Sequence, residues 1–303
     1  MCKRFDATRA VEDFCLECGT GEVFGLLGPD GAGKTTLIRM LAGVLTPDSG
    51  EACISGFKLS SEWEKIQELV GYVSQRFGLY PDLSVAENIG FFADIFSIPG
   101  SEQSGKVREL LELTDLYRFR DRLARNLSGG MKQKLSLCCA LIHAPRLLLL
   151  DEPTNGVDPV SRRDFWNIIV RLKQEGTTVL VSTVYLDEAE RCDRIGLMHE
   201  GRLMVSGSVA EIRSRMNLIL EVISPETRRL RSLLLTELDS GSLQLRGDRL
   251  YVVAGNLEQT GKIIAEIAEM NQIAVSGSRQ VIPNLENVFI DFMEKQVAER
   301  KVS

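Results

Sequence analysis

The order of apolar and polar residues along the chain predicts an α/β core. Short apolar runs that are typical of strands alternate with amphipathic stretches, and the run at 147–150 is apolar at every position. Continuous apolarity indicates a strand that is buried on both faces, as in a parallel sheet covered by helices. The expected strands of this core are residues 22–27, 70–74, 147–150, 178–181 and 195–198.

The strand pattern stops between residues 83 and 143, where helical patterns replace it. Ser84 and Glu87 have the spacing of a capping box, and an apolar run follows them. We therefore expect a helical subdomain at about 83–143, inserted into the α/β core. Four of its residues recur at the spacing of one helix face, namely Leu135, Cys138, Cys139 and Ile142.

The last third of the chain has the order βαββαβ, which is that of a ferredoxin-like unit. The sequence thus predicts a core domain at 1–215 and a smaller C-terminal α+β domain at 216–303, with a last amphipathic helix at 285–297. The other expected elements are a strand at 219–223, a helix at 227–238, a hairpin at 242–253 that turns at 246–248, a helix at 257–270 and a strand at 273–276.

Composition narrows the classes of function. The chain has 303 residues, of which 44% are hydrophobic and 26% charged, and its formal net charge is −6. This balance is typical of a soluble globular protein and lacks the basic excess of a nucleic-acid binder. We therefore expect no nucleic acid among the partners.

The sequence favours a chain that stays in the cytoplasm. No apolar run approaches the roughly 18 residues of a membrane-spanning helix, and residues 1–5 are not followed by the apolar core of a secretion signal. The seven cysteines are scattered through apolar segments, as in a reducing compartment. Cys15 and Cys18 form a lone CxxC without a second pair, which favours a structural role over a metal or redox site.

Residues 28–35 fit the pattern GxxxxGK[ST] of a phosphate-binding loop, between an apolar strand and a helical run at 36–41. Glycines let the backbone wrap around phosphates, so that successive N–H groups and a helix N-terminus face the anion. Lys34 would bridge the β- and γ-phosphates, and the Thr35 hydroxyl would hold Mg²⁺. The residues expected to bind nucleotide are Gly28, Pro29, Asp30, Gly31, Ala32, Gly33, Lys34, Thr35 and Thr36.

Two acids, Asp151 and Glu152, follow the apolar run 147–150. The carboxyl end of a central parallel strand lies beside the crevice in which ligands of open α/β sheets bind. Asp151 is suited to binding Mg²⁺, and Glu152 to polarising the water that attacks the γ-phosphate. Solvated loop carboxylates are common, so the pair alone does not define a site.

A third motif, LSGGMKQ, opens the second of the expected helices. A serine hydroxyl, two glycine N–H groups and a helix N-terminus form an anion site, although a simple N-cap has the same composition. Between the phosphate loop and the acid pair, however, the motif resembles the signature of the ATP-binding cassette (ABC) proteins. Its residues are Leu127, Ser128, Gly129, Gly130, Met131, Lys132 and Gln133.

The resemblance covers roughly residues 1–215 and implies roles for three further positions. Gln75 matches the glutamine that senses Mg²⁺ and the attacking water and that couples to the helical subdomain. Asp158 lies in the loop with which one subunit contacts the site of the other. Phe5 matches the aromatic residue that stacks on adenine, although as a bare residue it is equally suited to a core.

The family fold is a P-loop NTPase core with an inserted helical subdomain, and two such domains pair head to tail. The phosphate loop of one and the signature of the other then close on the same ATP, because the helix dipole and N–H groups of the signature complete the neutralisation of the γ-phosphate. The resemblance therefore implies ATP and Mg²⁺ as cofactors. It implies a second ABC ATPase domain and an integral membrane permease as partners, with the chain peripheral on the cytoplasmic face of the inner (plasma) membrane.

Three features depart from the family pattern. Val184 stands where a histidine that contacts the γ-phosphate is expected, and valine cannot donate a hydrogen bond or a proton. Asp30 replaces the usual asparagine, and we expect a small effect because both residues tolerate turns. The four residues before Phe5 are fewer than usual, which together with Val184 favours a trimmed chain or one half of an asymmetric tandem pair.

The leading hypothesis is an ATPase that drives export through a separate permease. Residues 283–290 resemble the ending of exporter ATPases for drugs, polysaccharides or lipids, although an ordinary amphipathic helix explains them equally well. The alternative is a nucleotide-binding clamp, or the regulatory half of an asymmetric pair, with slow turnover at Val184. A soluble cassette that acts on nucleic acid or ribosomes is disfavoured by the acidic charge and the single cassette.

Overall fold

The computed structural model describes residues 1–76, 78–214, 218–238, 242–254, 256–281 and 285–288. The chain divides into two compact units, Met1–Ser208 and Val209–Ser303, whereas the sequence pattern puts the change at residue 215. Within the described ranges, no helix is both long enough and apolar enough to cross a lipid bilayer.

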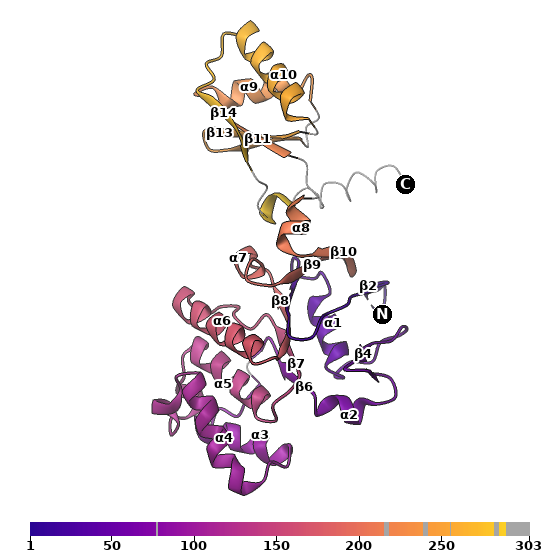
Figure 1. Ribbon diagram of the computed structural model, residues 1–303, viewed down its shortest axis with the longest axis vertical. Helices are drawn as coiled ribbons and strands as arrows, with labels where there is room; N and C mark the ends of the chain where they lie inside the picture. The colour runs from indigo at the N-terminus through magenta and orange to yellow at the C-terminus, as the bar shows by residue number, and fades with distance from the viewer. Residues whose placement is uncertain (77, 215–217, 239–241, 255, 282–284, 289–303) are drawn as a thin grey trace. The chain divides into compact units, whose positions relative to one another are not determined.

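A six-stranded sheet forms the centre of the first unit (Figure 1). Five strands are parallel, and the sixth, β10, pairs antiparallel with β9 at one edge. The five strands expected from the apolar runs are confirmed, whereas β10 was missed because its apolar run has only three residues, Leu203–Val205, with polar residues on both sides. In spatial order the strands are β10 (Arg202–Gly207), β9 (Arg194–His199), β3 (Val23–Leu27), β8 (Thr178–Thr183), β7 (Leu147–Asp151) and β6 (Val70–Val73).

Helices cover both faces of this sheet, and Figure 1 shows α1 (Lys34–Leu41) and α6 (Pro159–Gln174) on opposite sides of it. Helix α1 packs against β7, and α6 packs against β8. The run 148–150 in β7 has no exposed surface, as expected for a strand that is buried on both faces. Two shorter helices are α2 (Trp63–Gln67) and α7 (Leu186–Ala189).

The first unit also contains two short β-hairpins. Each strand has only two to four residues, which is too short for a periodic pattern to reveal. The pairs are β1 (Lys3–Phe5) with β2 (Thr8–Val11), and β4 (Cys53–Ile54) with β5 (Phe57–Lys58).

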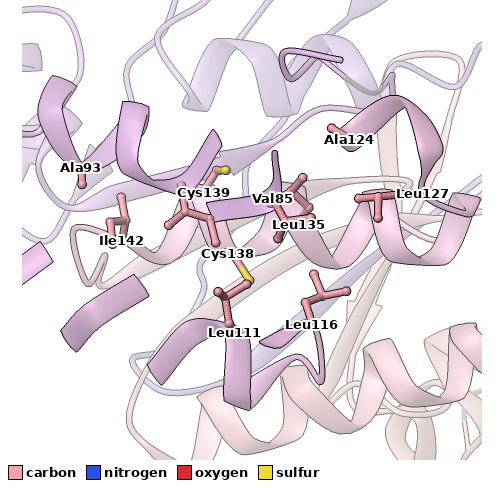
Figure 2. Packing of buried hydrophobic residues seen from close by; sticks show 11 residues of the cluster. Val85, Ala93, Leu111, Leu116, Ala124, Leu127, Leu135, Cys138, Cys139 and Ile142 are labelled. Carbon is pink, nitrogen blue, oxygen red and sulfur yellow. The ribbon is translucent and has the colours of Figure 1, made fainter. Parts of the chain in front are cut away.

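The segment between β6 and β7 is helical, as the sequence predicts. The capping box at Ser84 forms, since its side chain accepts from the Glu87 N–H and the Glu87 carboxylate accepts from the Ser84 N–H. The four residues predicted to share one helix face all enter a common core with Val85 and Leu111 (Figure 2). The elements are α3 (Val85–Ile95), α4 (Gly100–Leu113), the 3₁₀ helices η1 (Tyr117–Phe119) and η2 (Ala124–Asn126), and α5 (Gly129–Leu141).

The second unit folds as a ferredoxin-like domain, as predicted. Its four strands form one antiparallel sheet in the order β12-β13-β11-β14, so that the first and third strands of the βαββαβ unit lie in the centre. The elements are α8 (Val209–Ser214), β11 (Leu218–Ile223), α9 (Thr227–Leu234), β12 (Leu243–Arg246), β13 (Arg249–Ala254), α10 (Leu257–Met270) and β14 (Gly277–Val281).

Two predicted boundaries in this unit are wrong. The strand expected at 273–276 is β14 instead, because the apolar Ile273 packs into the core after α10 while the edge strand itself carries polar residues. The helix expected at 227–238 ends at Leu234, and turns follow it. Of the helix expected at 285–297, residues 285–288 are helical; its remainder, like part of the exporter-like ending at 283–290, lies outside the described residues.

Glu221 on β11 bonds to both strands that neighbour β11 in the ferredoxin-like sheet, β13 and β14. It is only 1% exposed, and its carboxylate accepts hydrogen bonds from Arg249 Nη1 and Tyr251 Oη, each at 2.8 Å, and from Arg279 Nε. The bond from Arg279 and then the bond from Arg249 lower the pKa of Glu221 to about 2. The carboxylate therefore stays ionised throughout the neutral and mildly acidic range.

We predict that Glu221→Gln destabilises the protein at pH 7, because two arginines lose their counter-charge. The difference from the wild type will shrink with acidity: the carboxylate stabilises the fold fully above its unfolded pKa of about 4.3, and this contribution is lost as the pH falls towards the folded pKa of about 2. Urea unfolding of both proteins from neutral pH downwards measures this. The exposed Glu258, which pairs with Lys262 on α10, provides the control Glu258→Gln. A difference that does not change with pH would contradict the prediction.

Candidate functional site

The phosphate loop connects β3 to α1, and two of its glycines are required by their surroundings. A Cβ added at Gly28 would lie 2.2 Å from the Met198 carbonyl oxygen, and one at Gly33 would lie 2.1 Å from that of Ala10. Gly33 also has φ 102°, a left-handed conformation that favours glycine. The loop therefore passes closer to the neighbouring backbone than any side chain allows.

Lys34 is the first residue of α1 and is almost completely buried, with 3% exposure. Its Nζ donates to the carbonyl oxygens of Gly28, at 2.8 Å, and Pro29, at 3.0 Å. It also lies 3.1 Å from Glu152 Oε1, a buried ion pair. The lysine and the proposed base are thus in direct contact.

Glu152 follows directly after β7 and is only 6% exposed. Its Oε2 accepts from Gln75 Nε2 at 2.8 Å and from Asn155 Nδ2 at 3.2 Å. Its backbone has φ 46°, a left-handed conformation that is rare outside glycine, and its N–H donates to Ser182 Oγ at 2.9 Å. The structure therefore brings three predicted residues together, since Lys34, Gln75 and Glu152 meet at one carboxylate.

Thr35 and Asp151 form a second pair beside this carboxylate. The Thr35 hydroxyl donates to Asp151 Oδ1 at 3.0 Å, and the Ser182 hydroxyl donates to the same oxygen at 3.0 Å. Asp151 has no exposed surface, and burial raises the pKa of its carboxyl while these two bonds oppose the shift. Its Oδ2 is buried and has no hydrogen-bond partner among the described residues. A hydroxyl and a carboxylate with a spare oxygen fit a hard divalent cation such as Mg²⁺.

The signature segment is held by different contacts. Ser128 is the N-cap of α5, and its side chain accepts from the Met131 N–H at 3.4 Å. Ser128 and Gly129 are exposed, whereas Gly130 abuts α6 so closely that an added Cβ would lie 2.5 Å from Ser161 Cβ. Leu127 and Gln133 are buried and Met131 and Lys132 are half-buried, so the helix is anchored while its tip faces solvent.

Three further predicted residues, Asp158, Phe5 and Val184, lie at exposed or half-buried positions. Asp158 caps α6, because its carboxylate accepts from the N–H groups of Val160, at 3.1 Å, and Ser161, at 3.0 Å, and these bonds lower its pKa. Phe5 in β1 is 48% exposed, so it is not a core residue. Val184 directly follows β8 and is half-buried.

Sequence reasoning missed Asn155 and Ser182, which contact the two acids. Ser182 could have been found from the parallel sheet, because it pairs in register with Asp151 on the neighbouring strand. Asn155 offered no periodic signal, since a turn folds it back towards Glu152. Both residues orient the acids through hydrogen bonds.

A strand, a glycine loop and a helix that hold a buried lysine beside a strand-end glutamate define a P-loop NTPase. Comparison with known proteins specifies the class further. Residues 11–155 match the ABC transporter family. The solved structure of an ATP binding subunit of an ABC transporter has a TM-score of 0.64 and 30% identity, and the match covers 71% of this chain and 90% of that one.

Several curated proteins are similar in sequence. The probable multidrug ABC transporter ATP-binding protein YbhF of Escherichia coli K12 is 42% identical over 298 residues, or 96% of this chain and 50% of that protein. The linearmycin resistance ATP-binding protein LnrL of Bacillus subtilis is 36% identical over 216 residues, or 71% of this chain and 69% of that protein. The chain belongs to the family of ABC transporter ATP-binding proteins. It spans about half the length of the first of these relatives.

We predict that Lys34→Met weakens ATP binding by about 10- to 100-fold, because the phosphates lose a buried cationic donor. Titration with a fluorescent ATP analogue measures the affinity. Lys65→Met is the matched control, since Lys65 is an exposed lysine that pairs with Glu62 on the surface. Equal ATP affinity in Lys34→Met and the wild type would show that this loop is not the nucleotide site.

Proposed function

We propose that this chain binds ATP with Mg²⁺ and hydrolyses it to drive export through a separate membrane permease. The observation that carries the proposal is the meeting of Lys34, Gln75 and Glu152 at the carboxyl ends of parallel strands. Names of relatives that mention drug resistance and Nod factor export support the export direction. The net charge of −6 supports the expectation that nucleic acid is not a partner.

Different residues would bind the nucleotide, hold Mg²⁺ and activate the attacking water. The loop N–H groups and Lys34 bind the phosphates, and Phe5 offers an exposed ring for the adenine. Thr35, Asp151 and Gln75 would hold Mg²⁺, which when bound neutralises phosphate charge. Glu152 takes a proton from the water whose oxygen bonds to the γ-phosphorus, while the bond from the γ-phosphorus to the bridging oxygen breaks and ADP leaves.

The contact between Lys34 and Glu152 links binding to this chemistry. Phosphate oxygens and the Glu152 carboxylate compete for one buried ammonium group. When the phosphates take it, Glu152 loses its cationic partner, and its Oε1 becomes available to accept a hydrogen bond from water. Nucleotide binding therefore releases the base that the reaction needs.

A second cassette would complete the site. The exposed tip at Ser128 and Gly129 offers a hydroxyl, N–H groups and the positive end of a 13-residue helix to an anion outside this chain. A cassette with 26% identity to this chain and a TM-score of 0.63 has been solved as a dimer in a post-hydrolysis state bound to ADP and Pi. By analogy, the tip would close on the γ-phosphate of a partner, with Asp158 at the same face.

The permease would be driven through the segment around Gln75. This residue lies between β6 and the helical subdomain. Its neighbour Ser74 lines a groove of about 360 Å³ whose walls are mainly apolar and aromatic side chains, including Tyr72, Leu79, Phe92 and Phe96. A movement of the segment around Gln75 would thus be transmitted to this groove, whose apolar lining is suited to binding an apolar segment of the permease. In this arrangement the chain works at the cytoplasmic face of the membrane without entering it.

A second candidate function is a clamp that binds ATP but turns it over slowly. Val184 favours it, because a valine at the end of β8 offers the γ-phosphate neither a donor nor a proton. Steady-state phosphate release separates the two functions.

We predict that Glu152→Gln lowers the kcat of ATP hydrolysis by about 100-fold or more while ATP affinity is kept or improved. The amide can neither accept the proton nor compete as an anion for Lys34. Phosphate release and nucleotide titration measure the two effects, and size-exclusion chromatography tests whether the variant forms an ATP-dependent dimer. The exposed Glu175 at the end of α6 gives the control Glu175→Gln. Unchanged phosphate release in Glu152→Gln would rule out its role as the base.

We predict that Val184→His raises kcat by about tenfold or more, because it supplies a donor and proton carrier next to the γ-phosphate. Val184→Leu, which changes only size, should leave kcat near that of the wild type. Fast hydrolysis by the wild type with no gain in Val184→His would contradict the prediction.

A further inference from the structure

Helix α7 contains a buried carboxylate that none of the roles above uses. Glu188 has no exposed surface. Its Oε1 accepts from Thr154 Oγ1 at 2.5 Å, and its Oε2 accepts from Thr183 Oγ1 at 2.6 Å. Both donors belong to segments that carry site residues.

Thr183 connects Glu188 to Val184, the position where the family pattern has a histidine. Besides donating to the carboxylate, the Thr183 hydroxyl accepts from the Tyr185 N–H at 3.0 Å. Thr183 and Tyr185 are the two neighbours of Val184. The carboxylate thus fixes the backbone on both sides of that residue.

Thr154 connects the same carboxylate to the base. It lies two residues after Glu152, in a turn where the Asn155 N–H donates to the Glu152 carbonyl and the Val157 N–H donates to the Thr154 carbonyl. Asn155 in turn holds the Glu152 carboxylate. Glu188 therefore joins the segment that follows β7 to the end of the neighbouring strand β8.

Arg162 connects this cluster to the loop that contains Asp158, with which one cassette is expected to contact the site of the other. It lies in the first turns of α6, where its N–H donates to the carbonyl of Asp158 at 2.9 Å. Its guanidinium group lies 3.9 Å from the centre of the Tyr185 ring, and its Nε lies 3.5 Å from Glu188 Oε1. This ion pair compensates the buried charge, which would be costly alone.

We propose that Glu188 is a positioning residue for ATP hydrolysis, which holds Glu152 and position 184 in a fixed relation and links both to Asp158 through Arg162. The inference rests on the proposed ATPase function and names the group that aligns its parts. Because each oxygen of Glu188 accepts from a hydroxyl, loss of its charge loosens both strand ends at once. The cluster is complete with valine at position 184, so it does not depend on a histidine there.

Glu188→Gln tests the proposal, because glutamine keeps the size but removes the charge that faces Arg162. We expect kcat to fall by about 10- to 100-fold, while KM and affinity for a fluorescent ATP analogue stay within about twofold. Amide hydrogen exchange at residues 154–157 and 183–185 should become faster. Asp187→Asn is the matched control: Asp187 is the adjacent acid, 3.9 Å from Arg162, but its side chain is 69% exposed. All values of this control should remain near those of the wild type.

A kcat and an exchange rate that are both unchanged in Glu188→Gln would overturn the proposal. So would a kcat that falls only in proportion to the amount of folded protein. Should Glu188→Gln not fold, Thr183→Val removes one hydroxyl at constant size and must show the same loss of kcat.

The ATPase function can fail separately. If the wild type binds ATP but releases no phosphate, the proposal of ATP hydrolysis is wrong. The rates of amide hydrogen exchange then decide by themselves whether Glu188 has the positioning role. Faster exchange at 183–185 in Glu188→Gln but not in Asp187→Asn supports that role, and equal exchange in the two variants refutes it.

Discussion

A lysine that is almost completely removed from water needs partners for its charge, and this need organises the nucleotide site. Lys34 meets it with two loop carbonyls and the carboxylate of Glu152. Burial of two ions costs several kcal/mol for each unless hydrogen bonds surround them. The tight loop with its required glycines, the amides of Gln75 and Asn155, and the turn after β7 all serve this one pair.

The parallel sheet makes these contacts possible. Strands β3, β7 and β8 are neighbours that run in the same direction, so their carboxyl ends meet at one edge. The phosphate loop, the acid pair and the segment that begins with Val184 each lie where one of these strands ends. Hydroxyl groups on β8 then bridge to its neighbours: Ser182 bonds the segment after β7, and Thr183 bonds Glu188. The Thr35 hydroxyl donates to the same Asp151 oxygen as Ser182, so residues 116 positions apart are fixed without a ligand.

Much of this could be predicted from the sequence, because the chemistry is concentrated in contiguous motifs. The loop at 28–35, the acids at 151–152 and the capping box at Ser84 depend on spacing along the chain. The structure places the loop between a strand and a helix, puts the acids at the end of β7, and forms the capping box. The ferredoxin-like order followed from alternating strand and helix patterns.

What the sequence did not reveal depends on tertiary contacts or on unusual polarity. Edge strands β10 and β14 are mixed or polar, so an apolar pattern misses or misplaces them. The role of Glu188 was hidden because a glutamate in a short helix normally indicates a solvated surface. Only the fold shows that Thr154 and Arg162, from distant segments, join the nearby Thr183 around it.

The left-handed backbone of Glu152 has a wider consequence. A glycine would adopt φ 46° readily, whereas a side chain there costs about 1–3 kcal/mol. The chain therefore keeps at this point a residue that opposes its own folding preference. Replacement of Glu152 by glycine would relieve this strain but remove the anion beside Lys34, so backbone stability and the buried ion pair make opposite demands at this position.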